Sequence, residues 1–127
     1  MGEVEPEDVV AEAHTSASRD HSSLWIGLMR VLTARLEQLP VPAEVVPVRE
    51  VAHRYWYGAR GDPAQLVAAK ELAWSFLKKY PPGTDVTTRE GRLVRAWLCV
   101  LEPNGDDEEI SMTTEWFSAM LSDLPAD

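Results

Sequence analysis

Histidine and carboxylate side chains are the groups with which this sequence could hold a metal ion or move a proton. Glu50 and His53 follow the Glu-x-x-His spacing, which is half of the motif found in di-iron carboxylate bundles. Such a site needs a second copy of the motif on another helix, and the sequence has none. The other two histidines, His14 and His21, fall in a segment that we expect to be frayed. We therefore predict no metal and no cofactor.

The sequence also lacks the patterns of a catalytic nucleophile or a phosphate-binding loop. Its single cysteine, Cys99, lies between two apolar residues, which is typical of a buried and inert thiol. There is no glycine-rich phosphate loop, Walker motif or zinc-ligand spacing. The acidic run at 104–109 does not have the spacing of an EF-hand loop. These features favour a binding protein over an enzyme, with a small-ligand-binding or enzymatic helical domain as the alternative.

Residues 60–62 spell Arg-Gly-Asp, the tripeptide that some extracellular proteins present to adhesion receptors. Asp62 stands directly before Pro63, and proline favours the first position of a helix. Gln65 follows three residues after Asp62, which completes a variant of the capping-box pattern. We therefore interpret the tripeptide as a turn followed by a helix cap.

Three aromatic residues in a row, at 55–57, are the best local candidate for a binding surface. Successive side chains of a helix point in different directions, so all three cannot face the interior. Exposed tyrosine or tryptophan beside arginine is typical of interface hot spots. We therefore predict a partner-binding group of Tyr55, Trp56, Tyr57 and Arg60. The tryptophans, one in each predicted helix, are otherwise expected to anchor the core: Trp25, Trp56, Trp74, Trp97 and Trp116.

The net charge of −9 is unevenly distributed along the chain. Residues 1–18 carry five acids and residues 96–127 carry eight, whereas all twelve Lys and Arg residues lie between Arg19 and Arg95. Concentrated negative charge can steer a basic partner. We therefore assign the acids of the C-terminal third to the partner-binding surface: Asp106, Asp107, Glu108, Glu109 and Glu115. Alternatively, the acidic ends fold back over the basic middle of the same molecule.

Three arginines at steps of three, Arg89, Arg92 and Arg95, form a basic stripe that could contact phosphate. The negative net charge argues against nucleic-acid binding, because DNA-binding domains are usually basic. We expect the stripe to pair with acids inside the bundle or on another subunit.

Apolar periodicity and capping residues predict five helices, at about 20–40, 47–58, 63–80, 87–102 and 112–124. The first has a wide apolar face, and Gly27 within it would let another helix approach closely. Residues 93–101 are also compatible with a short β-strand, but the polar lead-in carries helix caps. The last helix is expected to align four apolar residues at four-residue steps: Met112, Trp116, Met120 and Leu124. We predict an all-α fold, a compact and irregular bundle of about five helices.

A chain of 127 residues fits one domain. We expect residues 1–19 to be a mobile acidic arm and residues 20–127 to be the bundle domain. The acidic N-terminus argues against a signal peptide, and no apolar segment approaches the roughly 18 residues of a membrane span. A single cysteine and nine arginines to three lysines are typical of a cytoplasmic protein from a GC-rich bacterium.

Taken together, the sequence predicts a small acidic cytoplasmic protein that acts by binding another protein. One concrete form is an inhibitor or immunity protein that neutralises a basic effector. A second expectation is a domain that binds a small ligand between tryptophan and tyrosine side chains. A third is an accessory subunit, possible also as a homo-oligomer, for which the wide apolar face of residues 24–36 would be suited. Neither a membrane nor a nucleic-acid partner is expected.

Overall fold

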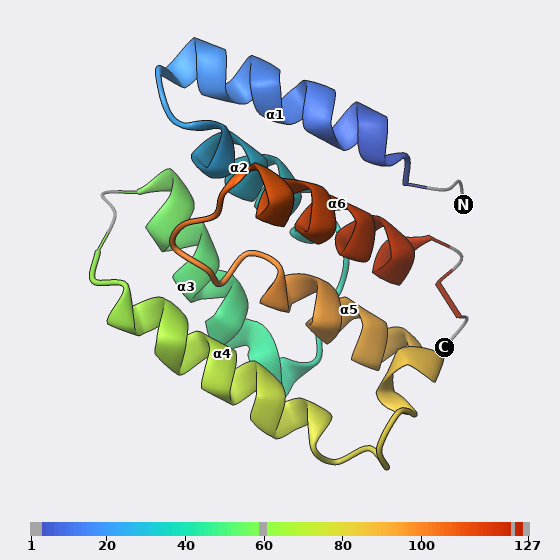
Figure 1. The fold of residues 1–127 in the computed structure, drawn as a ribbon. Coiled ribbons are helices and arrows are strands. Elements are labelled where there is room, and N and C mark those ends of the chain that lie inside the picture. The colour runs from blue at the N-terminus through green and yellow to red at the C-terminus, as the bar shows by residue number, and fades with distance from the viewer. Residues whose placement is uncertain (1–3, 59–60, 123, 126–127) are drawn as a thin grey trace.

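Six α-helices and two short 3-10 helices form the molecule in this computed structural model, which describes residues 4–58, 61–122 and 124–125 (Figure 1). The α-helices are α1 (Pro6–Asp20), α2 (Leu24–Leu36), α3 (Val46–Tyr57), α4 (Ala64–Leu77), α5 (Arg89–Leu98) and α6 (Asp107–Leu121). The 3-10 helices η1 (Ala43–Val45) and η2 (Asp85–Thr87) precede α3 and α5. The described residues contain no strand, so the predicted all-α bundle is confirmed and residues 93–101 are not a strand.

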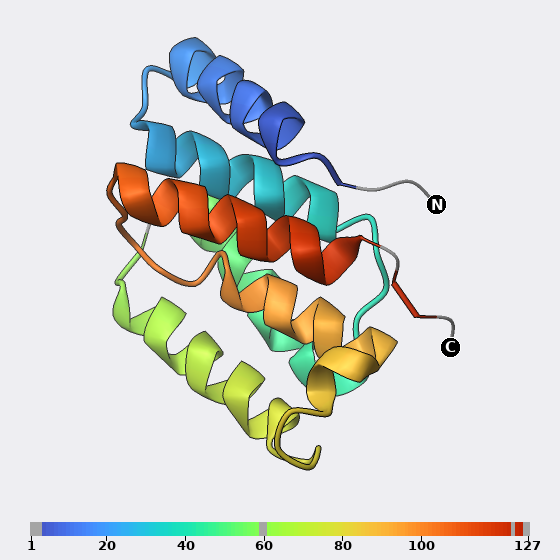
Figure 2. The ribbon, with the colours of Figure 1, turned by 45° about the vertical axis from the view of Figure 1, so that its right-hand side comes forward.

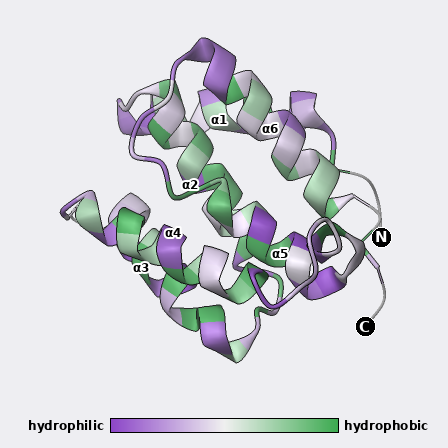
Figure 3. Ribbon diagram, turned by 60° about the horizontal axis from the view of Figure 1, so that its bottom comes forward, coloured by the Kyte–Doolittle hydropathy of each residue, from purple (hydrophilic) through white to green (hydrophobic). Residues whose placement is uncertain are grey.

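Helix α2 lies at the centre and packs against α1, α3, α5 and α6 (Figures 1 and 2). Its hydrophobic segments run through the middle of the molecule in Figure 3. The Oγ of Ser23 accepts a hydrogen bond from the Ile26 N–H at 3.2 Å, which caps the start of the helix. Four of its apolar side chains are completely buried: Leu28, Met29, Leu32 and Leu36. The wide apolar face predicted for this helix is thus explained by its packing against four neighbouring helices of the same molecule.

Helix α1 occupies the segment that we expected to be a mobile arm. It packs on α2 through small side chains, with Ala13 and Ala17 buried against Gly27. A Cβ added to Gly27 would lie 2.5 Å from the carbonyl oxygen of Ala13, so glycine is needed for this close approach. The sequence-based expectation missed α1 because its inner face is made largely of alanine and serine, which give a weak hydrophobic pattern.

Most of the predicted caps around α3, α4 and α5 are present. Pro47 stands in the first turn of α3, and Gly58 follows its last residue. The Oδ1 of Asp62 accepts a hydrogen bond from the Ala64 N–H at 2.9 Å, as predicted for a carboxylate before α4, but the N-cap position itself is Pro63 and no capping box with Gln65 forms among the described residues. The Oγ1 of Thr88 accepts from the Gly91 N–H at 3.0 Å and caps α5.

Helix α6 begins five residues earlier than predicted, because Asp106 and Glu109 of the acidic run form its capping box. The Oδ1 of Asp106 accepts from the Glu109 N–H at 2.9 Å, and Glu109 Oε1 accepts from the Asp106 N–H at 3.2 Å. Acids in the first turn are stabilised by the positive end of the helix dipole. At the other end, Val4 N–H donates to Ser122 Oγ at 3.1 Å, so two segments 118 residues apart lie together.

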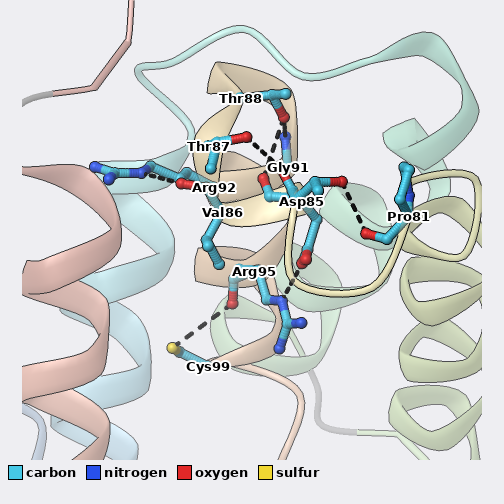
Figure 4. Close-up of polar contacts among 10 residues, drawn as sticks. Pro81, Asp85, Val86, Thr87, Thr88, Gly91, Arg92, Arg95 and Cys99 are labelled. Atoms are coloured by element: carbon cyan, nitrogen blue, oxygen red, sulfur yellow. Dashed lines mark hydrogen bonds and ion pairs between the residues drawn. The ribbon is translucent and has the colours of Figure 1, made fainter.

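The arginine stripe of α5 contacts backbone carbonyls and one carboxylate of the same chain (Figure 4). Arg92 donates to the carbonyls of Val86 and Ser122, at 2.7 and 3.1 Å. Arg95 Nε lies 2.5 Å from Oδ2 of Asp85, whose side chain is buried. The hydrogen bond from Arg95 lowers the pKa of Asp85 below its usual value. The stripe therefore fixes η2 and the end of α6 to α5.

Replacing Gly27 tests the close packing of α1 on α2. Gly27→Ala would gain about 1 kcal/mol from helix propensity alone. We expect instead a net loss of about 1–3 kcal/mol in the free energy of unfolding, because the new Cβ meets the backbone of α1. Urea denaturation followed by circular dichroism measures the difference, with Ala34→Gly at an exposed position of α2 as the propensity control. A stabilised Gly27→Ala variant would contradict the proposed contact.

The Asp85–Arg95 pair should make stability depend on pH. Because the native pKa of Asp85 is lowered, its carboxylate stabilises the fold above the unfolded pKa, and this contribution is lost as pH falls through the native pKa. Asp85→Asn should therefore cost about 1–3 kcal/mol near neutral pH, and the difference from wild type should shrink toward about pH 3. Denaturant titrations at a series of pH values measure this, with exposed Glu90→Gln as control. A pH-independent difference would argue against the pair.

Candidate interaction surface

Large apolar side chains that remain exposed are found at three places among the described residues. Tyr57 on α3 is 45% exposed. Val67 and Trp74 lie on α4, and Met112 and Trp116 lie on α6. Exposed aromatic and methionine side chains are enriched in protein interfaces. These three places are therefore where a binding surface should be sought.

Two members of the aromatic triplet lie in the core and not on the surface. Trp56 is completely buried, and its Nε1 donates to the carbonyl of Val100 at 2.8 Å. Tyr55 is also buried and meets the Trp56 ring edge to face. Their burial leaves Tyr57 as the one residue of the triplet that a partner can contact in this structure. Arg60, which we had grouped with them, lies outside the described residues.

Tyr57 is itself held by its own chain. Its hydroxyl donates to the carbonyl of Arg30 at 2.6 Å, and burial raises the pKa of this hydroxyl above its ordinary value. Its ring stacks on His53 with a centroid distance of 5.3 Å, and His53 Nδ1 lies 2.8 Å from Glu37 Oε2. This cluster fastens the end of α3 to α2. We therefore do not centre the candidate surface on Tyr57.

The acidic ends of the chain come together because α1 and α6 are neighbours (Figures 1 and 2). Some acids of α1 and of the segment before α6 do pair with arginine or lysine: Glu12 with Arg35, Asp20 with Arg30, and Glu102 with Lys70. Other acids of α1 and α6 are exposed and form no ion pair with a described residue: Glu7, Asp8, Asp107, Glu108 and Glu115. The fold-back alternative thus accounts for only part of the acidic charge.

A shallow groove of about 480 Å³ separates α1 from α6. Its α1 side presents the apolar side chains Val10 and Ala11 together with His14. Its α6 side includes Ser111 and Glu115. The groove therefore offers apolar contact area bordered by negative charge, which suits a side chain with an apolar stem and a basic end.

Met112 and Trp116 lie one turn apart on the outward side of α6. Met112 is 60% exposed and Trp116 is 44% exposed, whereas the inward side buries Ile110, Phe117 and Leu121. We expected Met112 and Trp116 to line the inner face because they stand at four-residue steps with Met120. The sequence did contain the correct signal, because Ile110, Thr114, Phe117 and Leu121 follow an equally regular helical spacing on the other side.

The candidate surface therefore consists of exposed residues on two helices together with the half-buried Val10. We call it the α1–α6 surface and define it as Glu7, Asp8, Val10, Asp107, Glu108, Met112, Glu115 and Trp116. Of the C-terminal acids predicted for partner binding, Asp107, Glu108 and Glu115 belong to it. Asp106 and Glu109 are also exposed, but their side chains are engaged in the capping box. The exposed tryptophan of this surface is Trp116, whereas we had placed the aromatic group at Trp56, which is buried.

A second pocket has a different character. It measures about 630 Å³ and lies between the 40–42 segment and the start of α5. Prolines, Leu93 and polar residues of α5 contribute to its lining, and Tyr80 is the aromatic residue among them. No tryptophan belongs to this lining, so the pocket differs from the aromatic cavity that we expected of a ligand-binding domain.

No protein-family model matches the chain, and no match is found among curated proteins or solved structures. Within the described part of the chain, no helix combines the length and the apolar character needed to cross a membrane. The α1–α6 surface must therefore be interpreted from its own chemistry.

Cys99 provides a test of how closed the core is. The thiol is buried, and this burial raises its pKa to about 12 from an ordinary value of 9.0. A difference of about three units means roughly 1,000-fold less thiolate at pH 8 than in the unfolded chain. We expect an aromatic disulfide reagent to react slowly with the native protein and rapidly in concentrated guanidinium. Equal rates under both conditions would show that the thiol is accessible.

Proposed function

We propose that this protein acts by binding a basic region of another protein through the α1–α6 surface. The observation that supports the proposal most directly is the exposure of Trp116 and Met112 on the same helix as Glu108 and Glu115, which form no ion pair with a described residue. Exposed tryptophan is costly to leave in water and is the residue type most enriched among interface hot spots. Its place on the same helix as unpaired carboxylates defines the chemistry of the expected partner.

The two kinds of residue serve different steps of binding. The carboxylates of α1 and α6 attract a positively charged partner over distances of about a Debye length, which raises the association rate. Trp116 and Met112 then enter an apolar pocket on the partner and slow dissociation. A basic side chain of the partner can lie in the groove near Glu115. Affinity and association rate should therefore respond to different substitutions.

An inhibitor or immunity protein is the form of this function that the charge favours. Surfaces that bind nucleic acid are positively charged, so an acidic protein can cover the active site of a nuclease or a similar basic effector. The acidic surface here is carried by two helices packed together, which hold their charges in fixed positions before the partner arrives. Such preorganisation reduces the entropy lost on binding.

Binding can be tested with two tryptophans of similar exposure. Proteins captured from the native host by the immobilised chain would be identified, and the dissociation constant of each purified partner measured. We expect Trp116→Ala to weaken binding by roughly 30-fold, as for a hot-spot residue. Trp74→Ala, on α4 and 40% exposed, serves as the matched control and should have little effect on partner binding.

The charge component needs a separate measurement. Glu108→Lys combined with Glu115→Lys should slow association and flatten its dependence on salt, because fewer charges then steer the encounter. Glu50→Lys on α3 has the same change in charge per site and is the control. The proposal fails if no partner is retained, or if the retained partner binds all of these variants equally well.

A further inference from the structure

The outward face of α4 carries apolar side chains that the described residues cover only in part. Val67 is 52% exposed and Trp74 is 40% exposed, and they stand two turns apart on one side of the helix. The opposite side of α4 is buried in the bundle by Leu66, Ala69, Ala73, Phe76 and Leu77. A helix that is apolar on both sides is typical of one that packs against two neighbours. Within the described chain α4 packs against α3, α5 and η1, and these contacts leave Val67 and Trp74 exposed.

Trp74 is held in place by the bundle before any partner arrives. The guanidinium of Arg95 lies over the Trp74 ring, 4.8 Å from its centroid. Arg95 is in turn fixed by its ion pair with buried Asp85. A large aromatic side chain that is already ordered loses little conformational entropy when it is covered. Trp74 therefore has the properties of an anchor residue.

Two opposite charges flank Trp74 on the same side of α4. Glu71 lies one turn before it and Lys78 one turn after it, and both are exposed. Neither forms an ion pair with a described residue. Seven residues separate them, or about 10 Å along the helix, which is too far for a direct pair within one helix. Each charge is available to a partner of opposite sign.

A second copy of this chain supplies both partners at once. When two α4 helices meet antiparallel about a two-fold axis beside Trp74, Glu71 of each copy faces Lys78 of the other. The two indole rings then meet near the axis, next to the small side chain of Ser75. The charge pattern is therefore complementary to itself.

We propose that the outward face of α4 is the interface of a symmetric homodimer. This interface does not depend on the α1–α6 surface, because α4 and α1 lie at opposite edges of the bundle (Figures 1 and 2). An antiparallel contact through α4 keeps the acidic helices of the two copies apart, so their mutual repulsion is small. A single helix pair buries less area than a standard interface, so the dimer is weak and reversible.

Sedimentation velocity over loading concentrations from about 1 µM to about 1 mM tests the dimer with the full chain. We expect a concentration-dependent shift from monomer to dimer. Trp74→Ala should raise the dissociation constant by about tenfold or more, because the central anchor is lost. Trp116→Ala, the matched substitution on the other surface, should leave it unchanged. These results are independent of any partner binding, so each proposal can fail alone.

A charge swap tests the symmetry of the interface. Glu71→Lys alone and Lys78→Glu alone should each weaken the homodimer by about tenfold, since each places like charges opposite one another twice. The double variant Glu71→Lys/Lys78→Glu restores both pairs and should dimerise like the wild type. An equimolar mixture of the two single variants should form a heterodimer, because each then meets its opposite charge.

Circular dichroism melts of every variant confirm that the fold is retained, as expected for exposed positions. A chain that stays monomeric over the whole concentration range overturns the proposal. A dimer that is insensitive to Trp74→Ala and to both single charge changes also overturns it, because the contact then lies elsewhere. Recovery of dimerisation in the double variant and in the mixture supports the two-fold arrangement.

Discussion

The close contact between α1 and α2 is the constraint on which the rest of the surface depends. Gly27 lets the backbone of α1 approach α2 to a distance that any side chain would prevent, and Ala13 and Ala17 fill the contact. This contact places α1 beside α6, and so joins two acidic segments from opposite ends of the sequence. Without it, the negative charge of the chain would lie on two unrelated parts of the molecule.

Ion pairs between α1 and α2 contribute little to stability, and their main effect is on the distribution of charge over the surface. Arg35 meets Glu12, and Arg30 meets Asp20 while also donating to the carbonyl of Trp56. Exposed pairs of this kind are worth at most about 1 kcal/mol each. Their larger effect is on the charge pattern, because they neutralise the acids of α1 nearest α2 and leave those nearer its start, Glu7 and Asp8, unpaired. The acidic surface is what remains after this internal neutralisation.

The sequence was sufficient to predict the positions of the central helices, but not to predict α1 or the start of α6. Helices α2 to α5 were predictable because Leu, Val and Trp recur at helical spacing and because Ser23 and Thr88 cap helices, while Asp62 accepts a hydrogen bond at the start of α4. Helix α1 was not, because alanine and serine become core residues only when another helix comes close enough to cover them. For the candidate surface, the exposure of the C-terminal acids followed from their charge, but the exposed tryptophan was sought at Trp56 and lies at Trp116. Residue type alone does not show that Trp56 is buried, with its indole N–H donating to the Val100 carbonyl, whereas Trp116 is exposed.

The hydrogen bond from Val4 to Ser122 has a consequence for the order in which the protein matures. It joins residues 118 apart in sequence, and contacts of such long range generally form late in folding. During synthesis, α1 to α5 leave the ribosome before α6. The acids of α1 are therefore made before the residues of α6 that complete the surface. A chain without α6 has neither Trp116 nor a complete groove, so the α1–α6 surface forms only after α6 has been synthesised.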